Sequence, residues 1–171
     1  MPPNPSLLPT TPLSLLWHSE QDTARLAAAL AGHPGIAEAH LNLSGDLGAG
    51  KTTFVRHLLS RLGVVGRIKS PTYAIVEPHE GLCQGAPLDI AHFDFYRFDA
   101  PEEWEDAGFR DAFAQSGLKL VEWPQRVRDL MPPADLELHI TWQAGTSETR
   151  CVTLTAHTPR GLDLLKSVSD A

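Results

Sequence analysis

Residues 45–52 read GDLGAGKT and match the phosphate-binding pattern G-x-x-x-x-G-K-[ST] in full. Glycines let the backbone curl so that successive N–H groups point at a phosphate, and the helix that follows adds its own unpaired N–H groups and dipole. We expect Lys51 to be exposed at the loop and to serve the β and γ phosphates of a nucleotide. The hydroxyl of Thr52 is expected to coordinate Mg²⁺.

The residues on either side of this stretch supply the context that the pattern needs. Residues 39–43 alternate apolar and polar side chains, as a strand does. From Lys51 onward the apolar residues recur on one face of a helix, and Gly63 suits its C-terminal cap. A strand, a glycine-rich turn and a helix predict a P-loop nucleotide hydrolase with ATP as its ligand. No NKxD-type guanine signature is present, which argues against Ras-like GTPases.

The rest of the chain predicts one α/β domain. Ser19 and Asp22 suit the start of a helix that ends at Gly32. Another helix begins at Thr158 and Pro159. Further strands are expected at residues 13–18, 73–77, 90–96, 118–122, 136–142 and 151–156, and short helices at 101–106 and 124–130. Residues 81–87 are expected to form a loop, the best site for a mobile insertion.

These elements predict a single P-loop NTPase domain over residues 13–171, preceded by a flexible Pro-rich tail over 1–12. Strands and helices alternate first, and strands in quick succession follow. The sheet should therefore be mixed, with a parallel nucleotide-binding half, antiparallel strands added late and helices on both faces.

Length and composition narrow the possible partners and location. A chain of 171 residues with 42% hydrophobic and 20% charged residues fits one globular domain. Its net charge of −7 gives no general attraction to nucleic acid or to anionic membranes. Cys83 and Cys151 lie far apart and suggest reduced thiols, hence a cytoplasmic location. No signal peptide and no long apolar stretch is evident, so we expect no membrane span.

Two acids compete to complete the magnesium site. P-loop enzymes hold Mg²⁺ with the loop Ser or Thr and an acid at the end of an apolar strand. Residues 118–122 end in Glu122, and residues 90–94 end in Asp94. Because Trp123 and Pro124 end the first of these strands abruptly, we expect Glu122 to hold the metal with Thr52. Asp94 would then support the metal ligands or orient water, although the two acids could exchange these roles.

Five motifs occur in one order along the chain: GDLGAGKTTFVR at 45–56, KSPTY at 69–73, HFDFYR at 92–97, GFRD at 108–111 and LVEWP at 120–124. On these motifs the chain, over residues 13–165, closely resembles the TsaE (YjeE) family of bacterial ATPases. That family supports the synthesis of threonylcarbamoyladenosine in ANN-decoding tRNAs.

The resemblance implies a small Mg²⁺-dependent ATPase with a mixed sheet and a low intrinsic turnover that depends on partners. Its partners would be the TsaD and TsaB proteins, which transfer the threonylcarbamoyl group to an adenosine beside the anticodon. ATP hydrolysis would reset that complex between turnovers.

Carried onto this sequence, the resemblance assigns catalytic roles to Lys51, Asp94 and Glu122, and metal binding to Thr52 and Glu122. It implies a switch-like loop at residues 70–73. Nucleotide contacts are expected from Asp46, Leu47, Gly48, Ala49, Gly50, Lys51, Thr52, Thr53, Thr23 and Trp123.

Other classes of function and of partner stay open from the residues alone. A small-molecule P-loop kinase, with residues 125–128 as a lid, is the main alternative, and a nucleotide-dependent interaction module with negligible turnover is a third. With 14 Lys and Arg against 21 acids, the isolated protein should bind tRNA weakly or not at all. Its influence on tRNA would be indirect, through protein contacts at residues 70–73 and 101–111.

Overall fold

The computed structural model describes residues 11–71 and 74–170. The expected tail over residues 1–12 therefore lies almost wholly outside the described residues, as do Thr72 and Tyr73. The strands are β1 (Leu13–Trp17), β2 (His40–Ser44), β3 (Val76–Cys83), β4 (Ala86–Asp94), β5 (Leu118–Glu122), β6 (Leu136–Trp142) and β7 (Arg150–Ala156). The α-helices are α1 (Glu20–Ala31), α2 (Lys51–Arg61), α3 (Glu102–Asp106), α4 (Phe109–Ala114) and α5 (Pro159–Ser169), and short 3₁₀ helices cover Pro34–Glu38 and Pro124–Arg126.

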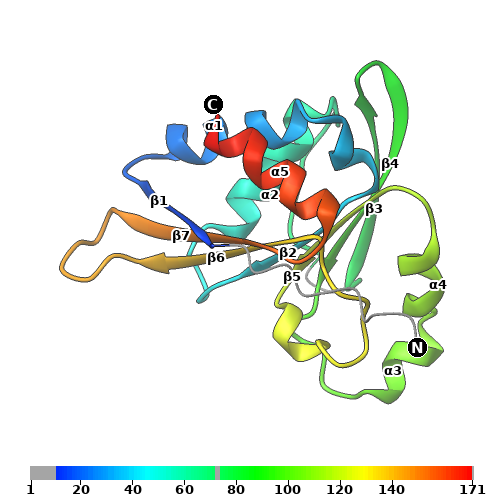
Figure 1. The fold of residues 1–171 in the computed structure, drawn as a ribbon. Coiled ribbons are helices and arrows are strands. Elements are labelled where there is room, and N and C mark those ends of the chain that lie inside the picture. The colour runs from blue at the N-terminus through cyan, green and yellow to red at the C-terminus, as the bar shows by residue number, and fades with distance from the viewer. Residues whose placement is uncertain (1–10, 72–73, 171) are drawn as a thin grey trace, which may run out of the picture.

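All seven strands join one mixed sheet in the order β1-β7-β6-β2-β5-β4-β3 (Figure 1). The four central strands β6, β2, β5 and β4 run parallel, and antiparallel strands flank them at both edges. The predicted mixed sheet is confirmed. The antiparallel strands are not all late in the sequence, because β1 and β3 precede most of the parallel strands.

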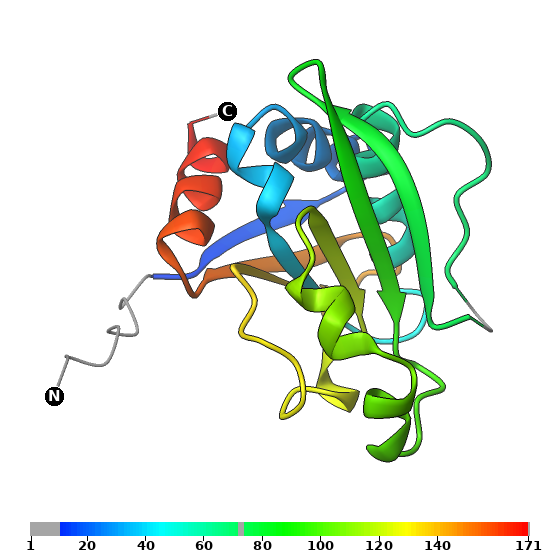
Figure 2. The ribbon, with the colours of Figure 1, turned by 90° about the vertical axis from the view of Figure 1, so that its right-hand side faces the viewer.

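Helices cover both faces of the sheet, each over its own apolar cluster. Figures 1 and 2 show α1, α2 and α5 gathered on one side, where residues such as Leu30, Phe54 and Leu164 are fully buried against the sheet. On the other face α3 and α4 bury Trp104 and Phe109 in an aromatic cluster with β4 and β5. Burying apolar area drives this layering. The packed helices hold in place the parallel strands whose ends form the site.

Several local predictions are confirmed. Ser19 caps α1 in a capping box with Asp22, and Gly32 caps its other end. The Thr158 hydroxyl caps α5 by accepting from the N–H of Gly161 at 3.1 Å. The strands at 118–122 and 136–142 have the predicted bounds as β5 and β6.

The prediction of a loop at residues 81–87 is wrong. β3 and β4 pair continuously from Val76–Phe93 to Cys83–Ala86, so only Gln84 and Gly85 remain in the turn. Their φ angles of 50° and 81° suit a tight two-residue hairpin turn. Gly81 and Pro87, which suggested a loop, lie instead in paired strands at the sheet edge, where proline is tolerated.

Two further helix boundaries differ from expectation. Residues 124–130 form only the 3₁₀ turn Pro124–Arg126, because Val127 leaves the helical conformation and is buried in the aromatic cluster. Helix α4 was not expected. Gly108, at a φ of 71°, separates it from α3 and lets Phe109 turn into the same cluster. Within the described residues, no helix is long and apolar enough to cross a membrane.

A buried histidine at the start of β2 predicts how stability depends on pH. His40 is 7% exposed, and burial lowers its pKa to about 4, against a partly offsetting hydrogen bond to Asn42. The unfolded chain therefore takes up a proton below pH 6.5, whereas the folded protein resists protonation until about pH 4. The contribution of His40 to stability is complete above pH 6.5 and is lost as the pH falls towards 4.

We expect His40 alone to lower the free energy of unfolding by about 2 kcal/mol between pH 7.5 and pH 5. Urea unfolding at both pH values, for the wild type and His40→Leu, measures this difference. The variant should lose most of the pH dependence, whatever its absolute stability. His79, whose pKa burial also lowers, contributes with the same sign, so His79→Gln is a useful second variant. An unchanged pH dependence in His40→Leu would show that another group is responsible.

Candidate functional site

The glycine-rich turn joins the end of β2 to the start of α2, as the sequence predicts. Gly45 has a φ of 142°, and a Cβ there would lie 2.3 Å from the carbonyl oxygen of Ile140, so only glycine fits. Gly48 and Gly50 have φ angles of 79° and 112°, in a region that glycine adopts without strain. The turn therefore delivers the unpaired N–H groups of the first turn of α2 to the end of the sheet.

Lys51 is buried rather than exposed, which corrects the expectation from sequence. Only 5% of the residue is accessible. Its ammonium donates to the carbonyl oxygens of Gly45 at 2.6 Å and Asp46 at 2.9 Å, and Nζ lies 4.4 Å from the centroid of the Trp123 ring. The side chain thus folds back over its own loop, beneath the ring of Trp123. The pattern of apolar residues in the sequence does not predict this contact.

The charge of Lys51 is balanced by the acids around it. Burial lowers the pKa of Lys51, and the carboxylates of Glu122, Asp94 and Asp46 act in the opposite direction. A cation whose present acceptors are backbone carbonyls can exchange them for phosphate oxygens, which bind an ammonium more strongly. Lys51 is therefore placed to serve an anion in the loop.

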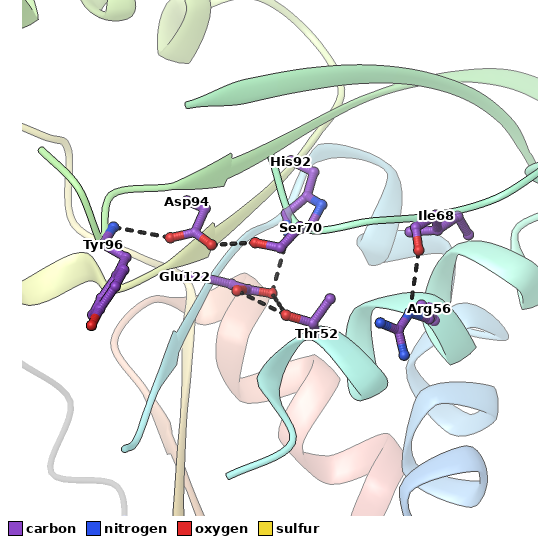
Figure 3. Close-up of polar contacts among 8 residues, drawn as sticks. All are labelled: Thr52, Arg56, Ile68, Ser70, His92, Asp94, Tyr96 and Glu122. Carbon is purple, nitrogen blue, oxygen red and sulfur yellow. Dashed lines mark hydrogen bonds and ion pairs between the residues drawn. The ribbon is translucent and has the colours of Figure 1, made fainter. Parts of the chain in front are cut away.

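Thr52 and Glu122 lie side by side, as expected for a magnesium site. The Thr52 hydroxyl is 2.9 Å and 3.1 Å from the two carboxylate oxygens of Glu122 (Figure 3). Glu122 is 1% exposed, and Nε2 of the fully buried His92 lies 3.3 Å from its Oε1. Hydroxyl and carboxylate oxygens are the ligands that Mg²⁺ prefers. These two side chains fit that ion.

Asp94 ends the neighbouring strand beside Glu122, because the two residues pair in the β4–β5 register. Its Oδ1 accepts from the N–H of Tyr96 at 2.9 Å, and its Oδ2 accepts from the hydroxyl of Ser70. Figure 3 shows the two carboxylates facing the same region from adjacent strands. Both oxygens of Asp94 are engaged by Ser70 and Tyr96, whereas the Thr52 hydroxyl donates to Glu122. Glu122 is therefore the acid next to the loop hydroxyl, as predicted.

One cleft of about 450 Å³ brings most of the predicted residues together. Its lining consists of Leu47, Gly48, Gly50, Lys51, Thr52, Thr53, Ser70, Asp94, Tyr96, Arg97, Glu122 and Trp123. Asp46 and Ala49 do not line it: Asp46 contributes its carbonyl oxygen to Lys51, and the side chain of Ala49 is fully buried. The volume is in the range of small-ligand sites.

Trp123 forms the aromatic wall of the cleft. Its φ of 57° is unusual for a non-glycine residue and especially before a proline. This conformation holds the indole 4.8 Å from the ring of Tyr96, measured between centroids, and over Lys51. Strained backbone of this kind persists where the surrounding structure requires it and is common at functional sites.

Thr23 lies in a smaller pocket of about 110 Å³ that adjoins the loop. Trp17, Glu20, Gly50, Thr53 and Arg150 complete its lining. Among the described residues, the buried Nε of Arg150 has no hydrogen-bond partner. Buried polar atoms are normally paired, so an unpaired guanidinium nitrogen beside Gly50 and Thr53 suits a polar or anionic ligand group.

Sequence reasoning missed Arg150, His92 and Tyr96. His92 and Tyr96 belong to the HFDFYR motif, whose Asp94 alone was assigned a role. Arg150 has no local signal, because it reaches the loop only through the pairing of β7 with β1 and β6 and through its stacking on Trp142.

A parallel strand, a glycine-rich turn and a helix, with an acid on the next strand beside the first threonine of that helix, define a P-loop protein of the α/β class. More particularly, the chain belongs to the TsaE family. The sequence profile described as "Threonylcarbamoyl adenosine biosynthesis protein TsaE" matches residues 17–152.

Individual relatives agree with that assignment. The chain is similar to the tRNA threonylcarbamoyladenosine biosynthesis protein TsaE of Haemophilus influenzae, with 38% identity over 75% of this chain and 77% of the relative. The protein of the same name from Bacillus subtilis is 39% identical over 78% and 77% of the two chains. The crystal structure of Bacillus subtilis YdiB has a TM-score of 0.68 and 26% identity, covering 94% of this chain and 95% of that one.

Proposed function

We propose that this chain is a cytoplasmic, magnesium-dependent ATPase that serves tRNA threonylcarbamoyladenosine biosynthesis. Its partners are the TsaD and TsaB proteins, and its ATP hydrolysis resets their complex between turnovers on ANN-decoding tRNAs. The observation that carries the proposal is the convergence of Lys51, Thr52 and Glu122 at the end of the glycine-rich turn.

The charged and hydroxyl side chains nearest the loop have distinct roles in this proposal. Lys51 binds the β and γ phosphates, and Thr52 and Glu122 hold Mg²⁺. The bound ion supplies positive charge that offsets the charge of the triphosphate. Asp94, fixed by Ser70 and by the N–H of Tyr96, orients the attacking water.

The nucleoside end of ATP is assigned to the smaller pocket. Thr53 and Gly50 line both hollows, so a ligand on the loop can extend from one into the other. Thr23 and Arg150 offer polar groups there, and Trp123 encloses the phosphate side. This arrangement gives a partner to the Nε of Arg150, which has no hydrogen-bond partner among the described residues.

A single-turnover experiment tests the proposal. Radiolabelled ATP is mixed with excess protein, alone and with the TsaD–TsaB complex and tRNA, and free phosphate is measured over time. We expect slow hydrolysis by the chain alone and acceleration of at least roughly tenfold with the partners, as for other partner-stimulated P-loop proteins. Phosphate transferred to a small-molecule acceptor would indicate a kinase instead. Nucleotide binding without turnover, even with the partners, would indicate an interaction module.

A further inference from the structure

The stretch from the phosphate loop to the start of β3 concentrates positive charge in an acidic protein. Residues 47–76 contain five Lys and Arg and no Asp or Glu, whereas the remainder holds nine Lys and Arg against all 21 acids. Residues 64–70 form the part that we call the basic loop. Figure 2 shows this connection protruding at one side of the molecule.

Three cations belong to the surface of the basic loop. Arg67 and Lys69 are exposed on it, and Arg56 of α2 donates from Nε to the carbonyl oxygen of Ile68 at 3.2 Å (Figure 3). Among the ion pairs of residues 11–71 and 74–170, none involves these three side chains. Their charges are therefore available to an external anion.

An exposed aliphatic residue stands among these charges. Val65 is 95% exposed, the largest exposed fraction among the large apolar side chains described. Protein interfaces bury apolar anchors at their centre and place charges at the rim. RNA-binding surfaces instead stack bases on aromatic rings, and residues 64–70 contain no aromatic residue. Three cations alone would hold RNA weakly at physiological salt. The combination favours an acidic protein surface.

Few contacts hold the basic loop, and one of them lies in the nucleotide cleft. Between residues 65 and 71 the described chain makes no backbone–backbone hydrogen bond. The N–H of Val64 donates to Leu59 at one end of the loop, Arg56 holds the carbonyl oxygen of Ile68, and the Ser70 hydroxyl donates to Asp94 at the other end. Segments with few such bonds rearrange most readily. Ser70 thus connects the basic loop directly to Asp94 in the nucleotide cleft.

We propose that Val65, Arg67 and Lys69, with Arg56 beside them, dock an acidic surface of the partner complex, and that the Ser70–Asp94 contact couples this docking to the nucleotide. The inference rests on the proposed function, because it takes the TsaD–TsaB complex as the partner. Beyond that function, the inference names the surface that docks, the acidic chemistry that it binds and the contact that connects it to the nucleotide cleft.

Binding kinetics on immobilised TsaD–TsaB complex test the surface. In 0.15 M salt we expect Arg67→Glu and Lys69→Glu each to weaken binding several-fold, and the double variant roughly tenfold, mainly through slower association. The difference from the wild type should shrink at 0.5 M salt, which screens these charges. Lys166→Glu, an equal charge change on exposed α5, is the control and should bind as the wild type does. Val65→Ser should also weaken binding, with little dependence on salt.

The coupling has a separate readout. The wild type should differ in affinity for the complex between a non-hydrolysable ATP analogue and no nucleotide, and Ser70→Ala should bring that ratio close to one. Circular dichroism and thermal unfolding confirm that each variant folds.

Each alternative result has one meaning. Failure of the wild type to bind TsaD–TsaB in any nucleotide state would remove the proposed function and this inference with it. Normal binding that the charge reversals leave unchanged would overturn the inference alone. It would also be overturned if the reversals abolished tRNA binding by the isolated protein, or its self-association in sedimentation, while leaving partner binding intact.

Discussion

Replacing Lys51 with alanine should lower ATP turnover by roughly 100- to 1000-fold, the loss seen when one preorganised donor to a developing charge is removed. Lys51 is buried in the cleft, and among the described residues its ammonium has only backbone carbonyls as hydrogen-bond acceptors. The proposed triphosphate would offer it the strongest available partners. Lys51 is the one lysine among the described residues that line this cleft.

The fold should survive the substitution. Keeping an ammonium largely out of water is costly, and the two hydrogen bonds to Gly45 and Asp46 offset that cost. Because the substitution leaves the carboxylates of Glu122 and Asp94 without this cation, we expect the free energy of unfolding to fall, but by less than the roughly 3–5 kcal/mol typical of a fully buried ion pair. Lys51→Met keeps the aliphatic stem under Trp123 and serves as the matched variant. Turnover at the wild-type rate in a folded Lys51→Ala protein would mean that the phosphates bind elsewhere.

Replacing Glu122 with glutamine should raise the Mg²⁺ concentration needed for half-maximal turnover by roughly 100-fold. Glutamine retains an oxygen that can accept from the Thr52 hydroxyl but loses the charge that attracts the ion. Nucleotide binding in the presence of a chelator should stay within about threefold of the wild type, because Glu122 is assigned to the metal and not to the nucleotide. Magnesium titrations of turnover and fluorescent-nucleotide binding without metal separate the two effects.

Asp94→Asn is the matched control, since it makes the same chemical change on the adjacent strand. It should reduce turnover at saturating Mg²⁺ with a much smaller effect on the Mg²⁺ requirement. If the metal-specific loss appears in Asp94→Asn and not in Glu122→Gln, the two acids exchange roles. Equal losses in both Glu122→Gln assays would make Glu122 a structural residue.

The phosphate loop and its acids were predictable because their signals are local. The glycines, lysine and threonine stand in one eight-residue pattern, and the acids end apolar strands that adjacent residues terminate. Parallel strands place their carboxyl ends at one edge of the sheet, so Asp94 and Glu122 had to meet.

The features that escaped prediction depend on contacts between distant segments. Lys51 is buried because Trp123, in a left-handed conformation, covers it. Arg150 reaches the loop from the far end of the sequence. The β3–β4 hairpin replaced an expected loop because pairing across the edge overrides the preference of Gly81 and Pro87 for irregular structure. Local periodicity carries none of this information.

The register that sets Leu43, Glu122 and Asp94 abreast also limits how this protein can change during evolution. Successive side chains of a strand point to opposite faces, so inserting or deleting one residue within β5 would turn Glu122 away from Thr52. Val121, which packs in the aromatic cluster, would turn to the opposite face at the same time, and a carboxylate would enter the cluster around Phe93. Length changes are therefore tolerable in the turns, such as that at Gln84 and Gly85, but not in the strands that carry the acids. The spacing from Leu118 to Glu122 is as much a part of the site as the carboxylate itself.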